Sequence, residues 1–520
     1  MRLSSLSFIS LAATACIFYS LTATAQTTES TQSYTAPYFA DKERAKKLAV
    51  HFPLIEKLYR EYAEKNHFPG YAFGVVLDGK MVFSGSGGFT DISKKTPATT
   101  RSLFRIASMS KSFTAMAIVQ LRDQGKLQLD DPVYKYVPEL KGQGLTTDAP
   151  AITIRHLLTH SAGFPEDNPW GDRQLADTEE QLIALIKEKI SFSNASGIAY
   201  EYSNLGFALL GYIIHRVSGI PYSEYIEKNI WQPLAMSQSS WEFSKVAPPL
   251  LAHGYRWIDN QWKEETPLHD GVWGAMGGMI TSIESLSKYV AFHLQAWPVR
   301  NDVESGPLKR SSLREMHQPW RISAVNAHYQ YPSGRACPQM SAYAYGLRVS
   351  EDCEGRKTVG HTGGLPGFGS NWVMLPEYGI GLMFFGNVTY APTSFANVMV
   401  MDTLLRLSGI QPMVLPASRI LTERRDLLIR LLPEWEGAVN TGFFAENFFD
   451  DYYVSKLREE ARAIYASAGR IVKSGEVVPE NQLRGYFIQE GEKANVRISF
   501  TLTPETPARI QEYHIALEKK

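Results

Sequence analysis

The sequence contains few cysteines. Only Cys16, Cys337 and Cys353 occur in 520 residues, too few for a disulfide-rich scaffold, and their spacing does not match a zinc site. If Cys16 is removed with an N-terminal leader, the remaining pair is compatible with one disulfide or with two free thiols. His156 and His160 in HLLTH lack the glutamate of H-E-x-x-H and a third ligand. We therefore expect no metal and no other cofactor.

An excess of either charge is also missing. Lysine plus arginine and aspartate plus glutamate both total 53, so the formal net charge is zero. No basic run with interleaved aromatic residues occurs, which argues against nucleic acid as a partner. After residue 25 no apolar run is long enough to span a bilayer, so we expect no stable membrane insertion. A small-molecule or peptide substrate remains as the expected partner, and the oligomeric state is left open.

The first 25 residues have the pattern of a signal peptide. Arg2 provides a positive start, an apolar and small-residue stretch follows, and Ala23-Thr24-Ala25 forms an A-x-A cleavage site. A membrane anchor is disfavoured because the apolar run is short and contains serines and threonines. The pattern predicts an exported protein, periplasmic or secreted, with a signal peptide over residues 1–25 and an N-terminal extension over residues 26–49.

The hydrophobic pattern predicts an α+β fold. Residues 70–88 alternate around an Asp-Gly turn, and residues 370–387 are typical of a strand, a turn and a strand. Between these hairpins, helices are predicted over residues 109–125, from residue 204, and after a capping box that starts at Thr281. We expect an antiparallel sheet built from sequence-distant strands and flanked by helices, with a helical lobe.

The domain organisation follows from a change in composition. The main domain is predicted over residues 50–407, and the Pro-containing segment 408–419 is typical of a linker. Residues 420–520 combine amphipathic helices with alternating strands and are predicted to form a small C-terminal α+β domain. No cluster of titratable residues in it suggests catalysis, so an interaction or capping role is expected.

Ser108 and Lys111 are the first candidates for catalysis. They form an S-x-x-K motif at the predicted start of a buried helix, where the first N–H groups have no intrahelical acceptor. The helix dipole favours negative charge there, and Lys111 lies one turn further on the same face. A second S-x-x-K, Ser285 to Lys288, lies inside a predicted helix. The context of Ser108 therefore favours acyl transfer.

Two further motifs follow in chain order, Tyr202-Ser203-Asn204 and His361-Thr362-Gly363 in GHTGGLPGFG. With these three motifs, and with the flanking segments KLQLDDPVYKYVPEL, TIRHLLTHSAGFP and WGAMGGMITS, the sequence resembles the serine β-lactamase and penicillin-binding-protein superfamily. It is most similar to the class C-like branch, which includes D-aminopeptidases and carboxylesterases. The resemblance covers roughly residues 50 to 405.

The resemblance implies roles for four residues. Ser108 matches the nucleophile, Lys111 the activating lysine and Tyr202 the tyrosine that acts as general base or acid. Asn204 matches an asparagine that binds the carbonyl of the acyl side chain or positions the lysine. Lysine and tyrosine both have ordinary pKa values near 10. For either to act as a base at neutral pH, its pKa must be lowered by about 3 units, which requires roughly 4 kcal/mol from its surroundings. The sequence leaves open which of the two does so.

The third motif departs from the family pattern. His361 occupies the place of the lysine in K-[ST]-G and is followed by Thr362 and Gly363. Gly364 would supply a second oxyanion N–H from the strand edge, in addition to the N–H of Ser108. The loss of a permanent cation is expected to weaken recognition of a substrate carboxylate, because a histidine is mostly neutral at pH 7. A literal K-S-G at Lys473 lies in the predicted C-terminal domain without the glycine-rich flank, and we disfavour it.

The expected activity is that of an exported serine hydrolase that forms an acyl-enzyme on an ester, an amide or a D-amino-acid peptide bond. β-Lactam hydrolysis is expected at most as a side activity. The alternative is a penicillin-binding-type protein that acylates slowly, or binds peptidoglycan or a β-lactam without efficient turnover. Trp170 and Trp273 either line the pocket or pack beneath loops.

Overall fold

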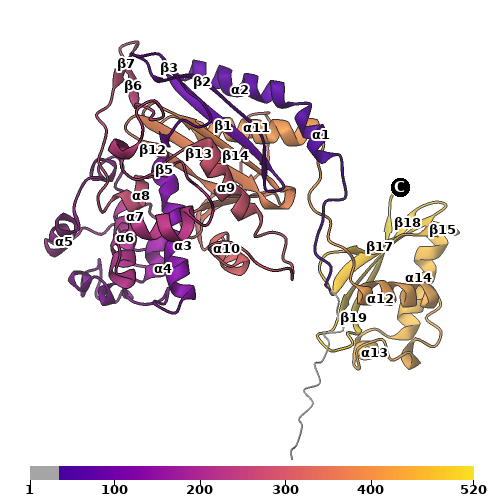
Figure 1. The fold of residues 1–520 in the computed structure, drawn as a ribbon. Helices are drawn as coiled ribbons and strands as arrows, with labels where there is room; N and C mark the ends of the chain where they lie inside the picture. The colour runs from indigo at the N-terminus through magenta and orange to yellow at the C-terminus, as the bar shows by residue number, and fades with distance from the viewer. Residues whose placement is uncertain (1–33) are drawn as a thin grey trace, which may run out of the picture. The chain divides into compact units, whose positions relative to one another are not determined.

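The computed structural model describes residues 34–520. The predicted signal peptide, residues 1–25, and the first part of the predicted extension lie outside the described residues. From residue 36 on, the chain divides into two compact units, Ala36–Leu415 and Pro416–Lys520 (Figure 1). The boundary between them falls inside the segment predicted as a linker. In the described part of the chain, no helix has the length and apolar character needed to cross a membrane.

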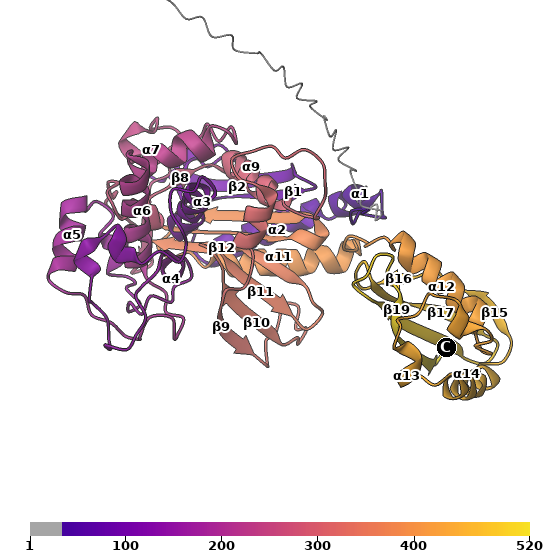
Figure 2. The ribbon, with the colours of Figure 1, turned by 90° about the horizontal axis from the view of Figure 1, so that it is seen from below.

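The first unit is built on an antiparallel sheet that has nine strands within the described residues, in the order β3-β2-β1-β14-β13-β12-β11-β10-β9. The N-terminal hairpin β1–β2 therefore pairs with β14, the last strand of the unit, so the sheet is built from sequence-distant strands as expected. Figure 2 shows β9 at the sheet edge. The strands are β1 (Gly70–Leu77), β2 (Lys80–Asp91), β3 (Thr96–Pro97), β9 (Arg321–Asn326), β10 (Gln339–Tyr343), β11 (Arg348–Asp352), β12 (Lys357–Leu365), β13 (Phe368–Leu375) and β14 (Ile380–Gly386).

Helices cover both faces of this sheet and also form a separate lobe at one end of the strands (Figure 1). α1, α2 and α11 belong to one face, α9 to the other, and α3 to α8 to the lobe. The helices are α1 (Arg44–Ala49), α2 (Phe52–Lys65), α3 (Ser110–Asp123), α4 (Ile154–Leu158), α5 (Glu179–Lys187), α6 (Asn204–Ser218), α7 (Tyr222–Ile226), α8 (Gly274–Gly277), α9 (Ile283–Leu294), α10 (Arg310–Met316) and α11 (Thr393–Ser408).

The central strands are buried on both faces, because helices pack on each side. Every residue of β1 and β14 is buried. On one face, Tyr59 of α2 stacks on Phe73 of β1 with ring centroids 4.5 Å apart, and its hydroxyl donates to Asn397 of α11 at 2.6 Å. On the other face, a Cβ at Gly74 would lie 2.8 Å from a methyl of Ile283 in α9, so glycine permits the close contact. The predicted α+β fold is confirmed.

The start of α9 differs from the prediction. Thr281 belongs to β8 (Ile280–Thr281), which pairs with β4 (Phe104–Arg105) and β5 (Ser239–Ser240). The helix is capped instead by Ser282, whose hydroxyl accepts from the N–H of Ser285 at 3.1 Å. The prediction of a capping box at Thr281 was wrong, because this residue is held in a small sheet whose partner strands are distant in the sequence. A separate hairpin is formed by β6 (Tyr255–Ile258) and β7 (Gln261–Glu264).

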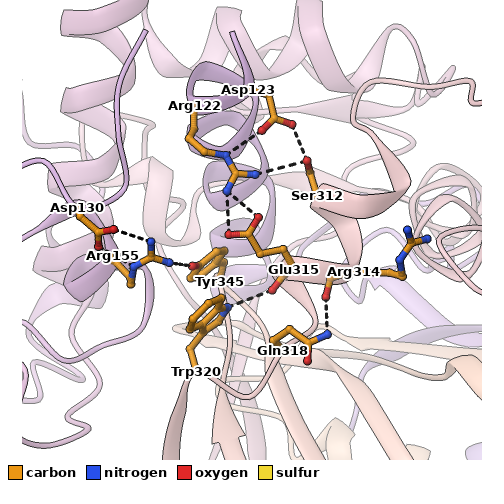
Figure 3. A network of polar contacts seen from close by, with 10 residues as sticks. All are labelled: Arg122, Asp123, Asp130, Arg155, Ser312, Arg314, Glu315, Gln318, Trp320 and Tyr345. Carbon is orange, nitrogen blue, oxygen red and sulfur yellow. Dashed lines mark hydrogen bonds and ion pairs between the residues drawn. The ribbon is translucent and has the colours of Figure 1, made fainter. Parts of the chain in front are cut away.

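A polar network ties the C-terminal end of α3 to the segment that leads into β9 (Figure 3). Arg122 of α3 donates to both carboxylate oxygens of Glu315 in α10, at 2.8 and 2.6 Å. Trp320 stacks on Tyr345 with ring centroids 5.2 Å apart, and Arg155 beside them donates to the Tyr345 hydroxyl. Tyr345 lies in the turn between β10 and β11, so the network fixes that turn against the helical lobe.

The two cysteines of this unit form a disulfide. Cys337 and Cys353 are bridged, with their Cα atoms 5.4 Å apart. The bond joins the segment before β10 to the turn between β11 and β12. Of the two possibilities that the sequence left open, the structure has the disulfide.

The second unit has a hydrophobic core of its own, which includes Trp435, Phe487 and Ile498. Its sheet has the order β15-β17-β18-β19, and β16 pairs with β17. Lys473-Ser474-Gly475 lies at the end of β15, in a different unit from Ser108. The elements are α12 (Arg419–Leu431), α13 (Phe448–Asp451), α14 (Val454–Ala468), β15 (Ile471–Ser474), β16 (Val478–Pro479), β17 (Arg484–Gly491), β18 (Asn495–Leu502) and β19 (Ile510–Glu518).

Candidate active site

Ser108 lies in a 3₁₀ turn, Ala107–Met109, directly before α3. Ala107 has φ of +49°, a left-handed conformation that is costly for a residue with a Cβ. The sharp turn places Ser108 at the N-terminal end of a buried helix, where the helix dipole favours a developing negative charge. Ser108 is among the residues that line a cavity of about 560 Å³. The predicted position at a helix start agrees with the structure.

Lys111 reaches back from the first turn of α3 to Ser108. Its Nζ lies 3.0 Å from Ser108 Oγ, 2.7 Å from Asn204 Oδ1 and 2.8 Å from the carbonyl oxygen of Met276 in α8. The side chain is fully buried. A neutral amine has two N–H groups and one lone pair, so it can donate to the two fixed acceptors, Asn204 and Met276, and accept from the Ser108 hydroxyl.

The environment separates the titrations of Lys111 and Tyr202. Burial lowers the pKa of Lys111 to about 7, although the carboxylates of Asp172 and Asp167 act in the opposite direction. Burial raises the pKa of Tyr202 well above its ordinary value, although Arg348 acts against this shift. Near neutral pH, Lys111 can therefore lose its proton, whereas Tyr202 remains a phenol that can donate one.

Asn204 contacts the lysine and is completely buried. Besides accepting from Lys111, its amide donates to Asn168 Oδ1 at 2.7 Å. The residue opens α6, and its backbone N–H and that of Leu205 both donate to the carboxylate of Asp167, at 2.7 and 2.8 Å. Asp167 thus caps the helix from a distant loop. Of the two roles that the resemblance allows for Asn204, the geometry shows the contact that positions the lysine.

His361 lies on β12 and does not line the cavity. It is almost fully buried. Its Nδ1 contacts the carbonyl oxygen of Thr362 and therefore carries the hydrogen, which leaves Nε2 to accept from the Tyr343 hydroxyl at 2.8 Å. Burial, Arg348 and Lys111 hold the pKa of His361 well below its ordinary value. The residue is neutral, as expected, and its predicted contact with substrate stays a prediction.

The glycines of the third motif let β12 approach the nucleophile. A Cβ at Gly363 would lie 2.1 Å from the carbonyl oxygen of Ile106 and 2.4 Å from Ser370 Oγ, so no larger residue fits. β11 pairs with β12 only up to Gly360, which leaves the following edge of β12 to face the turn of Ser108. Gly364 lines the cavity there and can present an N–H to an oxyanion.

Sequence reasoning missed Arg348, which begins β11 and lines the cavity. Its guanidinium carbon lies 5.5 Å from the centroid of the Tyr202 ring. The preceding turn is pressed against α3 at Gly346, where φ is +64° and a Cβ would lie 2.6 Å from the carbonyl oxygen of Lys111. The site therefore holds a permanent cation after all. Weak recognition of a substrate carboxylate was expected because His361 replaces the motif lysine. Arg348 supplies the cation that this replacement was taken to remove, so the expectation is corrected on this point.

A second group was also missed. Asp172 lies in the 3₁₀ turn Gly171–Arg173, and its Oδ2 accepts from the Tyr390 hydroxyl at 2.9 Å. Burial raises the pKa of this carboxyl to about 6. Neither residue is part of a motif that marks it in the sequence. The residues that line the cavity are Ser108, Glu166, Asn168, Asp172, Tyr200, Glu201, Tyr202, Arg348, Thr362, Gly364 and Tyr390.

The two tryptophans considered for the pocket do not line it. Trp273 is completely buried, and Trp170, half exposed, packs on it edge to face with ring centroids 5.5 Å apart. Their packing role is the one that the structure shows. Across residues 34–520, no group of three or more histidine, cysteine, aspartate or glutamate side chains is arranged to hold a metal ion.

A serine at a helix start, hydrogen-bonded to a buried lysine and flanked by a tyrosine and a glycine-rich strand, defines a serine-nucleophile site of the acyl-transfer type. The sequence model of the Beta-lactamase family matches residues 55–399 of this chain. The chain belongs to that family, and the predicted membership of the serine β-lactamase and penicillin-binding-protein superfamily is confirmed.

Two curated relatives are similar to it. Protein flp of Staphylococcus aureus (strain N315) is 28% identical over 351 residues, which cover 65% of this chain and 64% of that protein. Penicillin-binding protein 4* of Bacillus subtilis (strain 168) is 25% identical over 342 residues, which cover 64% of this chain and 71% of that protein. The chain thus spans somewhat less than two thirds of the length of Protein flp.

Solved structures share the fold. An octameric penicillin-binding protein homologue from Pyrococcus abyssi has a TM-score of 0.55 and 22% identity and covers 89% of this chain and 95% of its own. A D-stereospecific amidohydrolase from Streptomyces sp. has a TM-score of 0.53 and 23% identity and covers 66% of this chain and 97% of its own. At this level of identity, the likeness supports the fold alone.

Proposed function

We propose that this protein hydrolyses an ester, an amide or a D-amino-acid peptide bond through an acyl-enzyme on Ser108. The observation that carries the proposal is the position of Lys111 Nζ, 3.0 Å from Ser108 Oγ, with its contacts to Asn204 Oδ1 and the Met276 carbonyl oxygen made to fixed acceptors. A lysine held in this way delivers a lone pair to the serine hydroxyl and to no other group.

In the first half of the reaction, neutral Lys111 takes the proton of Ser108 as Oγ attacks the scissile carbonyl carbon. The N–H groups of Ser108 and Gly364 donate to the oxyanion that forms. Tyr202 gives its phenolic proton to the leaving group as the bond breaks, and the protonated Lys111 restores that proton. In the second half, water attacks the ester carbonyl by the same steps, and Ser108 leaves as the alcohol.

The substrate class is proposed from the charge in the cavity. Arg348 lies beside Tyr202, which protonates the leaving group, so it favours a leaving portion that carries a carboxylate. Peptide bonds followed by a C-terminal residue have this feature. β-Lactams also carry a carboxylate on the leaving side, so Arg348 does not disfavour them, and the penicillin probe below decides whether they are turned over.

Intact-mass spectrometry after brief exposure to a small activated ester and, separately, to a penicillin tests the proposal. We expect a mass gain and turnover with the ester, both lost in Ser108→Ala. A stable adduct with penicillin and no turnover of either probe would instead support a penicillin-binding-type protein that acylates slowly. The absence of both an adduct and turnover with both probes would contradict an active hydrolase.

Export is proposed as well, on the signal-like first 25 residues, and the Cys337–Cys353 disulfide is compatible with an oxidising compartment. Determination of the N-terminus of the protein purified from its natural source tests this. A mature chain that begins at Gln26 is expected, and an intact N-terminus recovered from the cytoplasm would contradict it.

A further inference from the structure

Asp172 is a buried acid that the proposed mechanism does not use. The residue is 1% exposed. Its Oδ2 accepts from Tyr390, whereas its Oδ1 has no hydrogen-bond partner among the described residues. A buried carboxylate oxygen without a donor is unfavourable and is uncommon unless a ligand completes the site. Asp172 also lines the cavity that contains Ser108, so a ligand bound there lies next to this residue.

The surroundings of Asp172 are shaped to hold it in place. Tyr390, its partner, has φ of +52°, a strained conformation for a tyrosine. The ring of Tyr390 lies against Gly364, where a Cβ would approach it to 2.9 Å. On the other side, a Cβ at Gly171 would lie 3.1 Å from that of Asn204. Asp172 is therefore held between Asn204 and the Gly364 end of β12.

The charges in the cavity are divided between two places. Arg348 lies beside Tyr202, where the leaving group is protonated. Asp172 and Tyr390 lie beside Gly364, where the carbonyl oxygen of the acyl group is held. Glu166 and Glu201 add two further carboxylates to the lining, and Arg348 is its only arginine or lysine among the described residues. A cationic group is the natural complement of the unpaired Asp172 oxygen.

We propose that Asp172 binds a protonated amine on the acyl half of the substrate. This inference rests on the proposed function and narrows it to aminoacyl amides and peptides with a free amino group, as opposed to N-acylated ones. An ammonium donates to Asp172 Oδ1, while a carboxylate on the leaving half pairs with Arg348. The two ends of a short zwitterionic peptide then fix the scissile bond over Ser108.

The test compares D-alanine p-nitroanilide with N-acetyl-D-alanine p-nitroanilide. Neither compound has a leaving-group carboxylate, so Arg348 does not enter the comparison. We expect kcat/KM to be about 10- to 100-fold higher for the free amine, the range typical of a hydrogen bond to a charged group. Asp172→Asn should abolish this preference by lowering kcat/KM for the free amine relative to that for the N-acetyl compound. Because the ratio is compared, an effect of Asp172 on Lys111 cancels.

Glu166→Gln is the matched variant, since it removes a carboxylate from the same cavity without touching the Asp172–Tyr390 pair. It should keep the preference. Retention of the preference in Asp172→Asn would overturn the proposal, and so would equal cleavage of the two anilides by the wild type. A small neutral ester tests the proposed function separately. If the ester is neither turned over nor forms an adduct on Ser108, the proposed function itself is contradicted. Ester turnover without cleavage of the free-amine anilide overturns only the role of Asp172.

Discussion

Burial controls the chemistry of Lys111. Lowering the pKa of a lysine from its ordinary value to about 7 means that the surroundings favour the neutral amine over the ammonium by roughly 4 to 5 kcal/mol. Desolvation is the main cause of this shift here. Asn204 and Met276 accept from the amine in either protonation state, so the lysine keeps its position when it loses its proton. The neighbouring Tyr202 shifts the other way, because desolvation disfavours a phenolate.

These shifts predict the pH dependence of the reaction. For a neutral ester, kcat/KM should rise with pH through about 7, because only unprotonated Lys111 accepts the serine proton. The Asp172 carboxylate raises the pKa of Lys111 and Arg348 lowers it. The acidic limb should therefore move to lower pH in Asp172→Asn and to higher pH in Arg348→Gln. Movement of both in the same direction would contradict the assignment of the limb to Lys111.

Tyr202 should act as a proton donor. Tyr202→Phe keeps the ring and removes the hydroxyl, so kcat for an amide substrate is expected to fall by about 10²- to 10³-fold while the protein stays folded. Tyr200→Phe, which changes a tyrosine in the same cavity, should cost much less. An activated ester with a good leaving group should be affected less than the amide, because it needs little help from an acid. Equal losses on both substrates would argue for another role.

At the level of secondary structure, the site depends on the contact between β12 and the turn before α3. Gly363→Ala would place a Cβ 2.1 Å from the carbonyl oxygen of Ile106. We expect the strand to move away from Ser108, with a loss of about 1 to 3 kcal/mol in stability and a loss of most activity. Gly144→Ala is the control, since the nearest atom to its Cβ lies at 3.7 Å. Thermal unfolding and ester hydrolysis measure both effects, and an active Gly363→Ala would contradict the close approach.

The disulfide stabilises the edge of the sheet that carries Arg348. The bridge closes a loop with a sequence separation of 16 residues, for which the chain-entropy model gives about 3 kcal/mol. The double variant Cys337→Ser, Cys353→Ser should lower the midpoint of denaturant unfolding accordingly. Thiol labelling of the denatured wild type, with and without reductant, checks that the bond is present. Full labelling without reductant would refute it.

At the scale of the whole molecule, the site belongs to one unit. The cavity residues all lie within Ala36–Leu415, and the second unit has its own core. A chain that ends at Leu415 should therefore fold and hydrolyse a small activated ester at the rate of the full-length protein. Residues 416–520 expressed alone should unfold cooperatively. An inactive, unfolded truncation would show that the units depend on each other.

Much of the fold was predictable because its signals are local. The Asp-Gly turn between β1 and β2, the apolar positions around α3, and the strand-turn-strand pattern of β13 and β14 each depend on neighbouring residues. The start of α9 was not predictable, because Thr281 pairs with strands that are distant in the sequence. The sequence from Thr281 does match a capping box, but Thr281 pairs in the small sheet and so does not cap the helix.

The sequence by itself determined part of the secondary structure, the order of the three motifs and, through them, the family. Ser108 and Lys111 were predictable as partners because one helical turn separates them. Only the tertiary structure decided which charges surround them. Arg348 and Asp172 reach the cavity from separate elements, and the Asp172–Tyr390 contact spans 218 residues. Such positions depend on the order of strands in the sheet and on close backbone approaches, as at Gly346, which no local pattern encodes.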